Sequence, residues 1–76
     1  MITVKLYGLL RLDSGIKEKQ LEADSVKQVL EALAACGVPR NDLNACVILV
    51  NGIGANKRSK LTDGDTVVLM SPVAGG

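Results

Sequence analysis

The chain has 76 residues and a net charge of +1, and it is 47% hydrophobic and 22% charged, which is typical of one small soluble domain. It has no histidine, two cysteines and a single aromatic residue, Tyr7. This composition argues against a structural zinc site, histidine-based catalysis and a base-stacking surface for nucleic acid. No apolar run approaches the ~20 residues of a membrane span, so we expect no membrane partner.

The first segment predicts a β-hairpin. Apolar residues alternate with Thr3, Lys5 and Tyr7 in the period of two that is typical of a strand with one buried face, and these apolar residues are Ile2, Val4 and Leu6. Gly8 ends the strand, and residues 9–12 are interpreted as a connecting turn packed on the core. The polar segment 16–22 follows a turn signal and predicts a solvated second strand.

The next segment predicts the main helix. Ser25 and Gln28 have the spacing of a capping box, and Asp24 places negative charge near the helix start. One apolar stripe follows at helical spacing, formed by Val26, Val29, Leu30, Leu33 and Ala34. Gly37 is typical of a helix C-terminus, and Pro39 prevents the helix from continuing.

The second half predicts further strands. Residues 41–44 are interpreted as a polar connection, and the apolar run 46–50 predicts a strand buried on both faces or in the middle of the sheet. Asn51-Gly52 and residues 63–65 are turn signals. In the last strand, residues 66–71, Val67 and Leu69 share one face, whereas Val68 and Met70 share the other.

A hairpin, one amphipathic helix and two or more strands predict an α+β fold of two layers. The arrangement predicts a ubiquitin-like β-grasp, in which a mixed sheet of four to five strands packs on one main helix. We expect residues 1–71 to form this domain and residues 72–76 to form a flexible tail. We also expect an intracellular, cytoplasmic protein in which Cys36 and Cys46 are reduced, buried apolar residues.

Three features could carry chemistry or binding. Asp63 and Asp65 are interpreted as turn formers rather than as a catalytic carboxylate pair. The basic residues of segment 57–60 could contact an acidic partner, although such runs are more often solvated loops. The sequence ends in Gly75-Gly76, which could thread a narrow channel and present an unhindered carboxylate to an activating enzyme.

These motifs resemble a known family. Val50-Asn51-Gly52, the segment 61–67 and the ending Pro72-Val73-Ala74-Gly75-Gly76 resemble the small subunit of molybdopterin synthase, a group within the ubiquitin-like sulfur carriers. The opening segment 4–11 is also similar to that family, so the resemblance covers nearly the whole chain in order and spacing.

The resemblance implies a carrier that is not an enzyme alone and that binds no cofactor. An E1-like adenylating enzyme would use ATP to activate the Gly76 carboxylate, a persulfide donor would supply sulfur for a thiocarboxylate, and the synthase large subunit would receive the tail. Tail and partner-binding residues would be Gly75, Ala74, Val73, Pro72, Met70, Val68 and Tyr7. Ser71 stands where the family often has a second proline, which would leave the tail freer.

Three alternatives remain open. The chain could be the related sulfur carrier of thiamine thiazole synthesis. It could be a ubiquitin-like protein modifier that forms an isopeptide bond from Gly76 to a target lysine, since the same adenylation would come first. It could also be a β-grasp binding module whose Gly-Gly ending is accidental.

Overall fold

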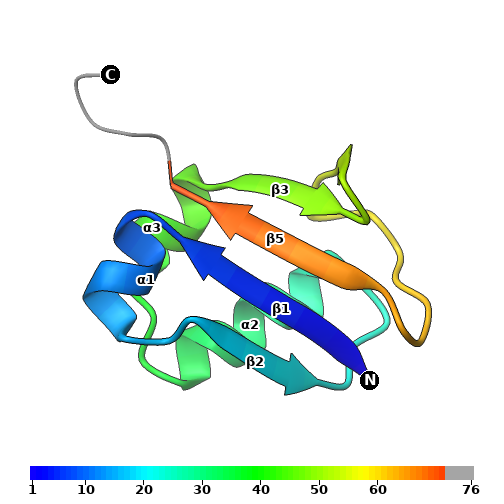
Figure 1. Ribbon diagram of the computed structural model, residues 1–76, viewed down its shortest axis with the longest axis horizontal. Helices are drawn as coiled ribbons and strands as arrows, with labels where there is room; N and C mark the ends of the chain where they lie inside the picture. The colour runs from blue at the N-terminus through cyan, green and yellow to red at the C-terminus, as the bar shows by residue number, and fades with distance from the viewer. Residues whose placement is uncertain (72–76) are drawn as a thin grey trace.

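The computed structural model describes residues 1–71, and its elements form a five-stranded sheet with one main helix against one face (Figure 1). The strands are β1 (Ile2–Tyr7), β2 (Glu18–Leu21), β3 (Val47–Val50), β4 (Ile53–Gly54) and β5 (Thr66–Met70). The helices are α1 (Leu9–Ser14), α2 (Val26–Ala35) and α3 (Arg40–Ala45). The predicted α+β fold is confirmed.

The sheet is mixed, with the strand order β2-β1-β5-β3-β4. The central strands β1 and β5 are parallel, while β1–β2, β3–β5 and β3–β4 are antiparallel. The first hairpin is therefore confirmed, and so is the β-grasp arrangement. Because β1 and β5 run the same way, both end at the same edge of the molecule, where α1 and α3 lie (Figure 1).

Helix α2 forms because its local signals agree with its tertiary packing. The Ser25 hydroxyl accepts a hydrogen bond from the Gln28 N–H, as predicted, whereas the Gln28 side chain accepts from the N–H of Asp24 at 2.6 Å. The first four residues of the predicted stripe are buried, and Ala34 packs against them at the rim. Together with Leu6, Val67 and Leu69 they fill the space between helix and sheet.

Two segments that were interpreted as connections are short helices. Residues 9–14 form α1, which begins after Gly8 and buries Leu10, and residues 40–45 form α3, which buries Leu43. Neither helix has a side-chain cap, so the local sequence carries little helical signal. The carboxyl of Asp13, on α1, raises the pKa of Asp42, on α3, because a protonated Asp42 can hydrogen-bond to it and because two carboxylates repel each other.

One expectation about burial holds in one of its alternatives, and another is wrong. Strand β3 lies inside the sheet, between β5 and β4, but it is not buried on both faces, because Val47 is 46% exposed on the face that no helix covers. Cys36 is exposed just beyond α2, and only Cys46 is partly buried. The Cys46 thiol donates to the carbonyl of Leu43 at 3.0 Å, and burial raises its pKa.

The predicted turns are confirmed. Asn51 and Gly52 both have positive φ, at 52° and 82°, which is typical of the tight turn that joins two antiparallel strands. Gly64 also has a positive φ of 91° at the turn before β5. Among residues 1–71, no helix is long and apolar enough to cross a membrane.

Candidate functional site

The uncovered face of the sheet carries a row of apolar side chains at the edge where β5 ends. Tyr7 on β1 pairs with Met70 on β5, and Met70 pairs with Val47 on β3. Their exposed fractions are 43%, 36% and 46%, so the row faces solvent although every member is apolar or aromatic. In the next row, Val68 pairs with Leu49, and both are half-buried.

We call Tyr7, Val47, Leu49, Val68 and Met70 the sheet patch. The structure places Tyr7, Val68 and Met70 together on the outer face, as their sequence parity indicates. Contiguous exposed apolar side chains on a small monomer often mark a binding surface. The sheet patch is therefore the candidate docking surface.

Sequence reasoning missed Val47 and Leu49. Their alternation with Ile48 and Val50 was available, but the run 46–50 is apolar throughout, so its two faces could not be distinguished. The signal that assigns them is the pairing register with β5, which places Val47 beside Met70 and Leu49 beside Val68. Non-local register of this kind is not readable from one sequence.

The chain leaves the sheet directly from the patch. Met70 is the last residue of β5, and Ser71 follows it with only 9% of its surface exposed. The remaining candidate residues lie outside the described part of the chain, so their predicted roles stay predictions. These residues are Pro72, Val73, Ala74, Gly75 and Gly76.

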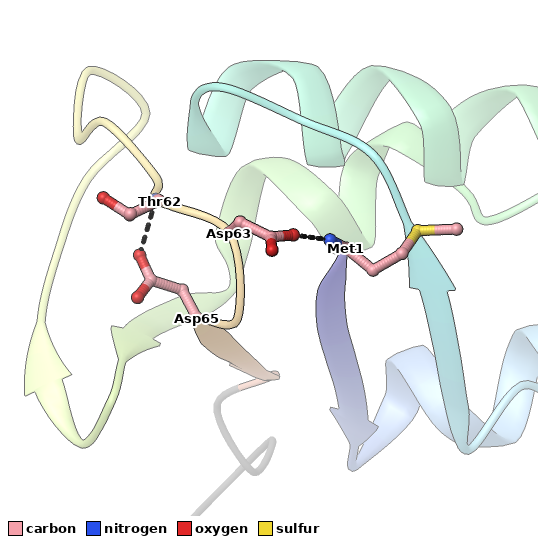
Figure 2. Close-up of polar contacts among 4 residues, drawn as sticks. All are labelled: Met1, Thr62, Asp63 and Asp65. Carbon is pink, nitrogen blue, oxygen red and sulfur yellow. Dashed lines mark hydrogen bonds and ion pairs between the residues drawn. The ribbon is translucent and has the colours of Figure 1, made fainter.

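The two aspartates of the last turn, Asp63 and Asp65, lie at the other end of β5, and each contacts a different partner (Figure 2). Asp63 pairs with the N-terminal ammonium of Met1, and Asp65 accepts from the N–H of Thr62 at 2.8 Å. Asp65 also accepts from the side-chain amide of Asn51 at 2.9 Å.

The hydrogen bond from the Thr62 N–H, followed by that from Asn51, lowers the pKa of Asp65. Both aspartates thus have structural partners on different elements. This geometry supports their interpretation as turn formers.

The basic segment lies on the helical side of the molecule, away from the sheet patch. Lys57, Arg58 and Lys60 are all exposed. Lys57 lines a shallow groove of about 150 Å³ with Lys27 and Arg40, beside Glu31. The ammonium of Lys57 donates to the side chain of Asn44 at 3.4 Å.

Within residues 1–71, no group of three or more histidine, cysteine, aspartate or glutamate side chains could hold a metal ion. Residues 1–71 place the apolar sheet patch beside the point where the chain leaves strand β5. An exposed apolar patch of this kind suits docking on a partner.

The family is decided by a sequence model that matches residues 4–76, nearly the full length. The chain belongs to the ThiS family. The matched range includes every strand from Val4 onward and the Gly-Gly ending. A comparison with proteins of curated function finds no match.

Solved structures agree with the assignment to the ThiS family. The chain is 25% identical to a subunit in the complex of subunits 1 and 2 of the molybdopterin-converting factor of Helicobacter pylori, with a TM-score of 0.75 over 99% of this chain and 97% of that one. It is also 25% identical to small archaeal modifier protein 1 of Methanosarcina acetivorans, with a TM-score of 0.80 over 99% and 95% of the two chains.

A more distant neighbour supports the fold alone. The Amycolatopsis orientalis BexX/CysO complex contains a chain with 19% identity, a TM-score of 0.77 and full coverage of both chains. Together the ThiS match and the first two neighbours identify the protein as a ubiquitin-like sulfur carrier, which was the family resemblance predicted from the sequence.

Proposed function

We propose that this chain carries sulfur as a thiocarboxylate on Gly76 and delivers it in the synthesis of molybdopterin. One observation carries the proposal: the ThiS match continues through residue 76 in a chain whose last strand leads from the sheet patch to the Gly-Gly ending. In this reading the folded domain docks on partners, and the terminal carboxylate is the reacting group.

The chemistry takes place in two stages on a partner enzyme. A Gly76 carboxylate oxygen attacks the α-phosphate of ATP, which forms an acyl-adenylate and releases pyrophosphate. The terminal sulfur of a persulfide then displaces AMP from the acyl carbon. Attack by a thiol on the resulting sulfur–sulfur bond leaves the thiocarboxylate on Gly76 and a disulfide on the donor.

The carrier contributes positioning rather than catalysis. It has no histidine, and glycine at the last two positions leaves the acyl carbon accessible within a narrow active site. We propose that the sheet patch docks first on an E1-like adenylating enzyme and later on the large synthase subunit. ATP is bound by the activating partner, and the carrier itself holds no cofactor.

The molybdopterin assignment is supported by the 25% identity to a chain of the Helicobacter pylori converting-factor complex over nearly its full length. A second candidate function is protein modification through an isopeptide bond from Gly76. It is favoured by the equal identity to small archaeal modifier protein 1 of Methanosarcina acetivorans. Thiamine thiazole synthesis is another sulfur-carrier pathway, and it requires the same thiocarboxylate.

Intact-mass spectrometry tests the proposal. The purified chain is incubated with the activating enzyme of its own organism, ATP and a persulfide source. We expect a mass gain equal to the replacement of one oxygen by one sulfur, located at Gly76. A variant extended by one residue after Gly76 is the control and should gain nothing.

An unmodified wild-type chain in the complete reaction contradicts the carrier proposal. Adducts that link Gly76 to lysines of other proteins instead favour the modifier function. Once the thiocarboxylate has formed, transfer to a molybdopterin precursor in the presence of the large subunit distinguishes the molybdopterin pathway from thiazole synthesis.

A further inference from the structure

The hydroxyl of Ser71 is held in a notch where β5 ends. Its Oγ accepts a hydrogen bond from the backbone N–H of Leu9 at 2.5 Å, and the Ser71 N–H donates to the carbonyl of Tyr7 at 3.5 Å. Ser71 is the most deeply buried polar side chain in the described part of the chain. Its two partners are the last residue of β1 and the first residue of α1.

Gly8, between those two partners, makes room for the hydroxyl. A Cβ on Gly8 would overlap with Ser71 Oγ and would lie 3.3 Å from the Ser71 carbonyl oxygen. Gly8 also has φ 69° and ψ −139°, a conformation that L side chains rarely adopt. Only glycine fits both the backbone and the space, so Gly8 and Ser71 form one structural unit.

This unit also starts helix α1. The carbonyl of Gly8 accepts hydrogen bonds from the N–H groups of Arg11 and Leu12, both at 3.1 Å. Gly8 is the N-cap residue of α1, and no side chain at this position caps the helix. The Leu9 N–H is one of the first-turn donors that a helix cannot satisfy internally. Ser71 supplies the missing acceptor from 62 residues away in sequence.

The unit of Gly8 and Ser71 lies directly beside the sheet patch. Ser71 follows Met70 and is bonded to Tyr7, and these two residues belong to the sheet patch. Ser71 therefore connects the sheet patch to residues 72–76 in the chain. The expectation that a serine in place of proline leaves the tail freer concerns residues outside the described part of the chain, whereas the Ser71 hydroxyl itself is bonded to the Leu9 N–H.

We propose that Ser71 is a positioning residue, whose bond to Leu9 sets the direction in which the C-terminal segment leaves the sheet patch. The inference rests on the proposed carrier function. A partner seated on the patch would then receive residues 72–76 from a fixed starting point, Ser71. Loss of the bond would free about one residue of backbone, which corresponds to roughly a five- to thirtyfold loss in the rate of the activated step.

Steady-state activation kinetics test this proposal with three serine variants. Ser71→Ala removes the acceptor but leaves the sheet patch intact. We expect kcat for adenylation to fall roughly five- to thirtyfold while KM for the carrier stays near wild type. Ser71→Thr retains a hydroxyl and should restore kcat.

Ser14→Ala is the matched control. The Ser14 hydroxyl donates to Leu10 at 2.5 Å and accepts from Ile16, so it is bonded at the far end of the same helix. Its removal should leave both kinetic constants unchanged, although it deletes a hydroxyl that is bonded to the same helix.

A double-mutant cycle with Gly8→Ala checks the notch itself. In the wild-type background the new Cβ must displace Ser71 Oγ, whereas in Ser71→Ala the nearest side-chain atom is the Ser71 Cβ at 3.6 Å, an ordinary contact. Gly8→Ala strains the backbone in both backgrounds, because Gly8 has a positive φ, so the loss of kcat should be larger in wild type, where the hydroxyl must also move, than in Ser71→Ala. Additive losses contradict a shared notch.

Amide NMR makes the outcome independent of the carrier chemistry. In Ser71→Ala, the Leu9 amide should exchange faster with solvent, and the order parameter of the amide at position 71 should fall relative to wild type and Ser14→Ala. If the wild-type chain is never adenylated, the proposed carrier function fails, and the NMR measurements alone test whether Ser71 is a positioning residue. Unchanged order parameters in Ser71→Ala contradict the positioning role. An unchanged kcat in an active carrier contradicts it as well.

Discussion

Replacing Met70 by arginine gives the sharpest test of the sheet patch. Met70 lies between Tyr7 and Val47 in one row across three strands, and 36% of it is exposed. Docking can bury no more than that remaining third. Because a fully buried methionine contributes roughly 1.5–3 kcal/mol, the lost apolar burial accounts for only about 0.5–1 kcal/mol.

The charge contributes the larger effect. A guanidinium that is desolvated in an interface without a partner costs several kcal/mol. We therefore expect Met70→Arg to weaken binding to the large synthase subunit by about 3 kcal/mol or more, which is over roughly a hundredfold in Kd. The thermal midpoint should change little, since exposed substitutions usually alter stability by less than about 0.5 kcal/mol.

Isothermal titration calorimetry measures the Kd for the large synthase subunit in Met70→Arg and in a matched control variant. Ile53→Arg is the control, because Ile53 is 72% exposed and pairs with Val50, so that it faces the helical side of the sheet. It introduces the same charge at an exposed apolar site outside the patch. An equal loss of affinity in the two variants would falsify the assignment of the patch as the docking surface.

The remaining predictions concern stability and the C-terminus. Leu33→Ala removes three carbons from a fully buried position on α2, so it should cost about 2–5 kcal/mol and lower the thermal midpoint by about 10 °C or more; a midpoint near wild type would refute the helix register. Deleting Gly76 should abolish sulfur loading with an unchanged midpoint, and a loaded variant would contradict the carrier function. Because the folded pKa of Asp65 lies below its ordinary value of 3.8, its stabilisation is present above that pH and is lost as pH falls; urea unfolding of Asp65→Asn should therefore show a weaker decline in acid. Because Asp13 raises the pKa of Asp42, Asp42→Asn should raise the midpoint at neutral pH, by less as salt is added, and a lower midpoint at every salt concentration would contradict that repulsion.

Elements with strong local signals were predictable from the sequence. The α2 helix combines a cap at Ser25, a continuous apolar stripe and Gly37 just past its end, so local and tertiary preferences agree. Strand β5 alternates with the same clarity, so its sequence alone separates Val68 and Met70 from the face that carries Val67 and Leu69. The turn at Asn51 was equally clear, since few residues tolerate positive φ.

Elements that depend on distant partners were not predictable. Helix α1 begins just after a glycine, Gly8, and the N–H of its first residue is satisfied by Ser71, which is 62 residues away in sequence. Helix α3 follows Pro39 and buries only Leu43, so its composition resembles that of a loop. Val47 and Leu49 belong to the sheet patch because the register of β3 on β5 places them beside Met70 and Val68, and this register is a property of the folded sheet.

The parallel pairing of β1 with β5 has a practical consequence for labelling. Because both strands point the same way, the amino end of β1 lies at the opposite end of the sheet from Ser71 (Figure 1). A fluorophore or affinity handle joined through Met1 would lose an ion pair with Asp63 in which both groups are largely exposed, and such pairs contribute little. Docking and loading can thus be followed in real time with a reporter that stays clear of the reacting end.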